Sequence, residues 1–302
     1  MDTTPADFDR YWQQTLDELA GYPAQPELER LPLRSTDFAT LYGVHLTSLG
    51  PYRLFGYLSI PTGEGPFPAL YYAPKYQSVL EIIPQGTANR QRSAYITFSL
   101  AGRGQRTSDS PYAAMFPGLL TEGIERPDSY IFRGIVADSV RGLEFLLTRP
   151  ELDPARVVGV GNDVALSTAA LHRGATHVVA TPALFYHTPE LAPRTQAYPL
   201  EEINDYLRAF PGRADAVNRT LAYYELQAFA PRVTTTTLLM AGPTGSPLDG
   251  RGLAPLVQAL RGPVTLHESE QSSYKDGLYA ETWMAGQCGI ADVQGILPEH
   301  WR

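Results

Sequence analysis

Residues 157–180 read VVGVGNDVALSTAALHRGATHVVA. Residues 157–161 form a short, β-branched apolar run that is typical of a buried strand, and residues 164–172 continue with the apolar spacing of a helix. A further apolar run begins at 177–180. A strand, a helix and a second strand at this spacing predict a βαβ crossover, and a βαβ crossover predicts a mostly parallel sheet.

The same alternation of strand and helix patterns extends in both directions from this unit. Before it, residues 38–49 and 52–60 alternate in polarity around Gly50-Pro51 and predict an antiparallel pair. Further strands are predicted at 68–73, 94–100, 237–241 and 264–267, and further helices at 128–147, 253–260 and 280–285. We therefore expect one α/β domain over residues 1–302, with an N-terminal helical arm at 1–30 and a lid-like helical insertion at about 185–230.

Composition narrows the classes of partner. The chain has 302 residues, of which 43% are hydrophobic, so it can bury a large core. Its 24 Lys and Arg against 32 Asp and Glu give a net charge of −8 without a basic block, so nucleic acid is not an expected partner. The single cysteine, Cys288, fits a reducing compartment. With no signal-like or membrane-spanning stretch in the sequence, we expect a cytoplasmic protein without a membrane partner.

Several ordered stretches carry a resemblance to a known family. They are DFDRYWQQTLDEL at 7–19, RGQ at 103–105, FPGLLTEGIERPDSYIFRGIVADSVRGLEFL at 116–146, INDYL at 203–207 and RTLAYYELQAFAPRV at 219–233. In the third stretch the matching positions are Pro117, Gly118, Gly123, Tyr130, Arg133, Asp138 and Arg141. The chain resembles the cephalosporin-C deacetylases and acetyl xylan esterases, a family of carbohydrate esterases. The resemblance implies an α/β-hydrolase fold with a mostly parallel central sheet flanked by helices.

The resemblance also implies a catalytic Ser-His-Asp triad, and its three positions are substituted here. The family serine lies in a G-x-S-x-G turn after the strand at 157–160, where this chain has Asp163. The family aspartate and histidine follow the last two strands, where this chain has Gly245 and Ser272. No other G-x-S-x-G occurs. Because a serine is a poor nucleophile without its histidine and acid, we expect a catalytically inactive pseudo-esterase.

Other parts of the family's pocket are predicted to remain. The resemblance places an oxyanion-binding segment after the first central strand, at Tyr76 and Gln77, and a second donor at the backbone N–H of Val164. Asp163 would put a fixed negative charge where an oxyanion must develop. The simplest structural interpretation of Asp163 is a helix N-cap, a position at which aspartate is strongly favoured.

Two alternatives remain open from the sequence. Asp163 could be the nucleophile of a hydrolase with altered chemistry, assisted by His187 or His267 as base and by Asp249 as acid. The chain could also be a non-catalytic binder of acetylated carbohydrates or other small molecules.

Metal and cofactor sites are not expected, because no histidine pair, cysteine pair or phosphate loop has the required spacing. Family members form ring-like oligomers through the loop that follows R-G-Q. Because the corresponding loop at 106–116 is shorter here, a homo-oligomer is an open expectation.

Overall fold

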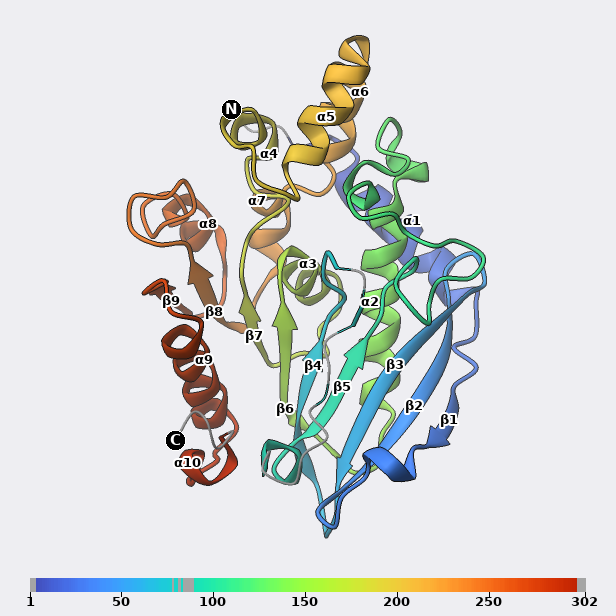
Figure 1. Ribbon diagram of the computed structural model, residues 1–302, viewed down its shortest axis with the longest axis vertical. Coiled ribbons are helices and arrows are strands. Elements are labelled where there is room, and N and C mark those ends of the chain that lie inside the picture. The colour runs from blue at the N-terminus through green and yellow to red at the C-terminus, as the bar shows by residue number, and fades with distance from the viewer. Residues whose placement is uncertain (1–3, 78, 81–82, 84–89, 298–302) are drawn as a thin grey trace.

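The computed structural model describes residues 4–77, 79–80, 83 and 90–297, which contain a nine-stranded sheet in the order β1-β2-β3-β5-β4-β6-β7-β8-β9 (Figure 1). The strands are β1 Glu27–Arg30, β2 Ala39–Ser48, β3 Tyr52–Pro61, β4 Phe67–Tyr72, β5 Ile96–Leu100, β6 Leu152–Gly161, β7 His177–Ala180, β8 Thr236–Ala241 and β9 Val264–Glu268. Strands β1 to β3 pair antiparallel, as does β3 with β5, and the remaining pairs are parallel. The predicted mostly parallel sheet is confirmed.

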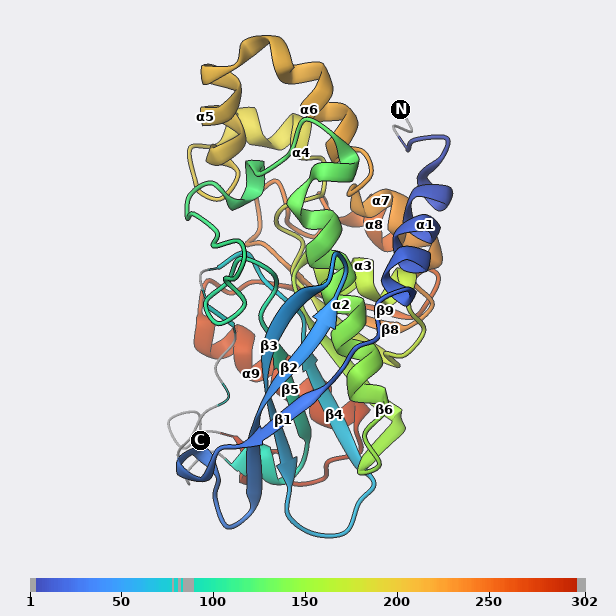
Figure 2. The ribbon, with the colours of Figure 1, turned by 90° about the vertical axis from the view of Figure 1, so that its right-hand side faces the viewer.

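Helices cover both faces of this sheet. They are α1 Phe8–Ala20, α2 Ile131–Leu147, α3 Asp163–Leu171, α4 Thr188–Leu191, α5 Glu201–Ala209, α6 Ala214–Leu221, α7 Leu226–Phe229, α8 Ala254–Ala259, α9 Ser273–Gln287 and α10 Val293–Ile296. Figure 2 shows α1, α2 and α3 on one side of the sheet and α9 on the other. Two separate apolar clusters fill these two interfaces, and the smaller one joins Val158 and Leu238 of the sheet to Met284 of α9. Within the residues described here, no helix is both long and apolar enough to cross a membrane.

The N-terminal arm packs on the C-terminal part of the insertion, near Tyr223 and Tyr224. The indole N–H of Trp12 donates to the carbonyl of Tyr223 at 3.0 Å, and the hydroxyls of Tyr11 and Tyr224 lie 2.8 Å apart. The insertion itself carries α4 to α7, and Figure 1 shows α4, α5 and α6 above the carboxyl ends of β6 and β7. Residues more than 200 positions apart in the sequence therefore hold the arm against the insertion.

Strand β1 and helix α9 are among the elements that differ from the sequence prediction. Strand β1 was not predicted, because its four residues, ELER, are all exposed and show no apolar alternation. Helix α9 begins at Ser273 rather than at 280, since Ser272 accepts the N–H of Lys275 as an N-cap. Gly277 interrupts the helical pattern in the first turns of α9, which is why the sequence suggested a later start.

Candidate active site

Residues of the family signature build the framework behind the carboxyl edge of the sheet. The Arg103 guanidinium donates to both carboxylate oxygens of Asp138 on α2, at 2.9 and 2.7 Å, and the Asp138 side chain has no exposed surface. Farther along α2, Arg141 donates to the carbonyls of Leu19 and Tyr22, at 2.7 and 2.6 Å. The signature thus joins the β5 loop to α2, and α2 to the end of α1.

Gln105 holds the segment that follows β4. Its side-chain oxygen accepts the N–H of Gly102 at 2.8 Å, and its side-chain nitrogen donates to the carbonyls of Lys75 and Gln77, at 2.6 and 2.9 Å. The predicted pocket residues Tyr76 and Gln77 are half-buried on this segment. Tyr76 therefore lies on a backbone segment that is fixed from both sides.

Asp163 is the first residue of α3, directly after the turn that follows β6, and its side chain is completely buried. The carboxylate accepts the backbone N–H groups of Ala183 and Leu184, each at 3.1 Å, and of Phe185 at 2.9 Å. Successive backbone N–H groups that converge in this way form a nest for an anion. Here the nest is filled by a side chain of the same protein.

The N-cap interpretation of Asp163 is wrong. Asn162 is the N-cap of α3, with no side-chain capping bond, and Asp163 is the first helical residue. Its carboxylate bonds the segment after β7 rather than the start of its own helix. Asp163 does not have a positive φ. Among the described non-glycine residues, those that do are Gln25, Thr107, His187 and Gln271. The turn after β6 therefore lacks the strained backbone that exposes a nucleophile at a hydrolase elbow.

A second buried carboxylate reinforces the same connection. Glu225 accepts the backbone N–H of His187 at 2.9 Å, and burial raises the pKa of Glu225 to about 7. Burial also raises the pKa of Asp163, while the N–H groups of Phe185 and its neighbours oppose that shift. The connection at 183–187 is thus held by two acidic side chains through its backbone.

Gly245, the position that corresponds to the family aspartate, lies in a tight turn. Gly245 is at its exposed tip with φ +87°, and its N–H donates to the Asp249 carboxylate at 2.8 Å. Asp249 also accepts the N–H groups of Arg251 and Gly252. In the described part of the chain, no imidazole hydrogen-bonds to Asp249. Its observed role is therefore to shape this loop.

The place of the family histidine begins helix α9, where Ser272 is the N-cap. His267, on β9, pairs with Met240 in the register, so it points to the α9 face of the sheet. There its Nε2 lies 2.9 Å from Asp276 Oδ1, and its ring stacks on Tyr279 at 4.0 Å. Burial opposes ionisation of Asp276, but hydrogen bonds from Ser269, Glu270 and His267 lower its pKa to about 2. This His-Asp pair joins β9 to α9.

Within the described residues, His187 makes no hydrogen bond to the Asp163 carboxylate. It has left-handed backbone, with φ 50° and ψ 37°, and its ring packs against Tyr186 at a centroid distance of 4.3 Å. All hydrogen bonds found for the Asp163 carboxylate come from backbone N–H groups. The structure therefore brings neither His187 nor His267 into hydrogen-bond contact with Asp163.

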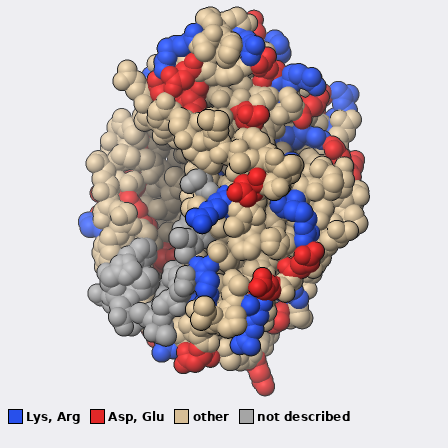
Figure 3. Space-filling view, turned by 45° about the vertical axis from the view of Figure 1, so that its right-hand side comes forward, with Lys and Arg blue, Asp and Glu red and all other residues tan. Residues whose placement is uncertain are grey.

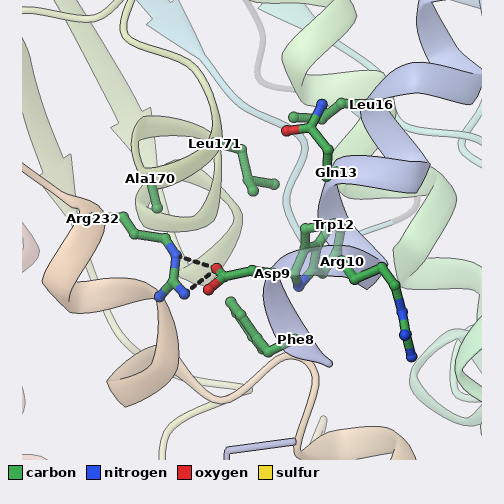
Figure 4. A pocket seen from close by; sticks show the side chains of 9 residues that line it. All are labelled: Phe8, Asp9, Arg10, Trp12, Gln13, Leu16, Ala170, Leu171 and Arg232. Atoms are coloured by element: carbon green, nitrogen blue, oxygen red, sulfur yellow. Dashed lines mark hydrogen bonds and ion pairs between the residues drawn. The ribbon is translucent and has the colours of Figure 1, made fainter. Parts of the chain in front are cut away.

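Two hollows lie elsewhere on the surface. One, of about 440 Å³, lies between α1, the end of α3 and Arg232, which pairs with Asp9 (Figure 4). The other, of about 220 Å³, lies at the start of α2 beside Arg103 and Arg133. Neither is lined by Asp163, Gly245 or Ser272.

Neither the candidate metal-binding side chains nor the surface charges of the described residues indicate a further binding site. Among the residues described, no group of three or more His, Cys, Asp or Glu side chains could hold a metal ion. Figure 3 shows acidic and basic side chains interspersed over one face of the molecule.

Sequence reasoning missed three components of this region: the backbone nest at 183–185, Glu225 and Asp276. Backbone donors leave no mark in a sequence, and Glu225 lies 38 positions along the chain from His187, whose N–H it accepts. Asp276 was detectable only as an acid in the first turn of a helix whose start was placed too late.

A mostly parallel sheet with helices on both faces, and a tight turn from β6 into α3 near its centre, defines the α/β-hydrolase fold. The family model described as acetyl xylan esterase (AXE1) matches residues 1–245. The chain therefore belongs to the acetyl xylan esterase family, as its signature predicted.

Individual relatives agree with this assignment. The acetyl esterase Axe7A of Xylanibacter ruminicola is 25% identical over 251 residues, which are 79% of this chain and 56% of that protein. The chain thus spans little more than half the length of this relative. Acetyl xylan esterase 1 from Thermoanaerobacterium sp. JW/SL YS485 superposes with a TM-score of 0.80 at 20% identity, covering 95% of each chain. The acetyl xylan esterase from Paenibacillus sp. R4 gives 0.82 at 18%, covering 95% of this chain and 96% of that one. These two likenesses concern the fold.

Proposed function

We propose that this protein is a pseudo-esterase: a member of the acetyl xylan esterase family that does not hydrolyse esters. The observation that carries the proposal is the state of Asp163. Its carboxylate has no exposed surface and is engaged by three successive backbone N–H groups. A side chain in this state has a structural task that excludes contact with substrate.

The chemistry of acyl transfer supports the same conclusion. A serine nucleophile needs a histidine to take its proton and an acid to orient that histidine. By family resemblance these three positions are Asp163, Gly245 and Ser272, and none of these residues can perform its assigned step. An enzyme that loses its whole triad keeps a rate enhancement of roughly 10³ to 10⁴ over the reaction in water, which comes from substrate binding and the oxyanion hole alone. The charge of Asp163 would lower even this remainder, because it repels a developing oxyanion.

The geometry does not favour Asp163 as a nucleophile. Attack by a carboxylate requires an exposed oxygen, and hydrolysis of the resulting ester requires a base beside it. Asp163 is buried, and His187 and His267 have other contacts. An alkyl ester formed there would accumulate rather than turn over.

A second candidate function is the binding of acetylated carbohydrates or other small molecules. The observation in its favour is Gln105, which keeps the segment of Tyr76 and Gln77 fixed although the triad positions have changed. A thermal-shift series with acetylated xylo-oligosaccharides tests it, since a ligand that binds only the folded state raises the melting temperature. A flat response across the series would remove this candidate.

The pseudo-esterase proposal is tested by acetate release from acetylated xylo-oligosaccharides and by labelling with a fluorophosphonate, which marks activated serines. We expect the native protein to match its heat-denatured form in both assays. Stoichiometric labelling of one serine in the native protein alone would overturn the proposal.

We also infer a cytoplasmic location. The inference is supported by Cys288, the single cysteine of the chain, which is buried and forms no disulfide within the described residues. Fractionation of the source cells with an antibody to the protein tests it, and recovery outside the cytoplasm would contradict it.

A further inference from the structure

Strand β9 forms one edge of the sheet (Figure 1). Some of its backbone hydrogen-bonding groups therefore face outward. The N–H of Thr237 bonds the carbonyl of Pro263 at 2.8 Å, and the N–H of Ser269 bonds that of Ala241 at 3.2 Å. Because inward and outward groups alternate along a strand, Val264, Leu266 and Glu268 present their N–H and C=O groups to the outside. Within the described residues, these groups have no hydrogen-bond partner.

The two edges of the sheet are protected very differently. Strand β1, at the opposite edge, reads ELER and is fully exposed, so its charges discourage pairing with another strand. Strand β9 reads VTLHE and contains neither lysine nor proline. Its one carboxylate, on Glu268, is already bonded by the N–H of Gly250 and the hydroxyl of Thr244. Apart from its length of five residues, the β9 edge therefore lacks the features that prevent strand addition.

Exposed apolar side chains lie on both faces of the sheet at the same edge. Nine large hydrophobic side chains are exposed in the described chain, and three of them lie between positions 266 and 279. They are Leu266 at 36%, Tyr274 at 44% and Tyr279 at 39% exposure. Tyr279 stacks on His267, so its ring lies directly beside β9. An open strand edge flanked by exposed apolar and aromatic side chains has the character of an interface core.

We propose that β9 pairs antiparallel with β9 of a second copy of this chain, so that the two sheets become continuous. A two-fold axis at Leu266 sets the outward groups in register, because Leu266 then faces Leu266 of the second copy and Val264 faces Glu268. Each facing pair can exchange both of its backbone hydrogen bonds. No like charges oppose each other in this register, whereas pairing of two β1 strands would crowd their charged side chains.

Matched leucines on the two edges provide the first test. Leu266 of β9 and Leu28 of β1 are exposed to similar extents, 36% and 40%. By light scattering after gel filtration, we expect wild-type protein and L28K to dimerise at micromolar concentration. In L266K two lysines would face each other, and we expect the dimer dissociation constant to rise about tenfold or more. A monomeric wild type, or an L266K variant that associates like L28K, would overturn the proposal.

Disulfide trapping provides a second test that does not depend on affinity. Facing residues of a hydrogen-bonded antiparallel pair have Cα atoms about 5.5 Å apart, which is within the range that a disulfide spans. L266C should therefore form a covalent dimer under mild oxidation, and L28C should not. The native Cys288 has no exposed surface and will not compete. Absence of the L266C dimer would also overturn the proposal, and either result is independent of esterase activity.

Discussion

Replacement of Asp163 by alanine distinguishes a structural carboxylate from a catalytic one. In the structure the carboxylate is the shared acceptor for the N–H groups of Ala183, Leu184 and Phe185. Truncation at a functional position is often neutral or stabilising, since such positions are commonly not optimised for stability. Here we expect the opposite sign, because the variant loses the acceptor for three donors at once.

The magnitude follows from these contacts. Each buried donor left without an acceptor costs roughly 1 to 3 kcal/mol. Part of this loss is offset, because a fully buried carboxylate is itself costly, as the raised pKa of Asp163 indicates. We expect a net loss of about 3 kcal/mol in the free energy of unfolding, and a fall in melting temperature of about 10 °C.

Urea unfolding followed by circular dichroism measures this loss. Asp109, an exposed aspartate, is the matched control, and D109A should remain within about 0.5 kcal/mol of wild type. A D163A variant as stable as wild type, or more stable, would refute the structural account of this residue.

Three further changes probe the surrounding contacts. Because burial raises the pKa of Glu225 from 4.5 to about 7, the folded state retains a proton that the unfolded state releases, so its contribution to stability falls as pH rises through 7. E225Q should remove this dependence, worth about 3 kcal/mol between pH 5 and 8 in urea titrations; an unchanged pH profile would contradict it. Q105A leaves the carbonyls of Lys75 and Gln77 without their shared donor, so it should lower the free energy of unfolding by about 2 kcal/mol in the same assay. An unchanged free energy of unfolding would show that other contacts hold this segment. W12A should cost about 3 to 5 kcal/mol, because the side chain is 1% exposed between arm and insertion; a loss below 1 kcal/mol would argue against that coupling.

The repeating pattern of strands and helices was readable because burial imposes it on the sequence. Residues 157–161 and 177–180 are buried strands in a parallel sheet, and such strands appear as continuous apolar runs. The exposed strand β1 left no such pattern, since no face of it is buried. The sequence also placed Asp163 correctly at the turn after β6, because apolar residues end there.

The partners of the polar side chains could not be read in the same way. Asp163 bonds backbone groups about twenty residues away, and any residues other than proline at 183–185 would supply those N–H groups. The direction of His267 depends on its register with Met240, and a shift of one residue would turn it to the other face. The candidate site was therefore predictable in its position along the chain but not in its contacts.

The most direct test of the central claim is the rate of p-nitrophenyl acetate hydrolysis by the purified protein, measured beside D163A and the heat-denatured protein. Catalysed turnover by the family mechanism needs a serine, a histidine and an acid within reach of one another. The account predicts the same rate for all three samples. Saturable hydrolysis by the wild type that is lost in a folded D163A variant would contradict it.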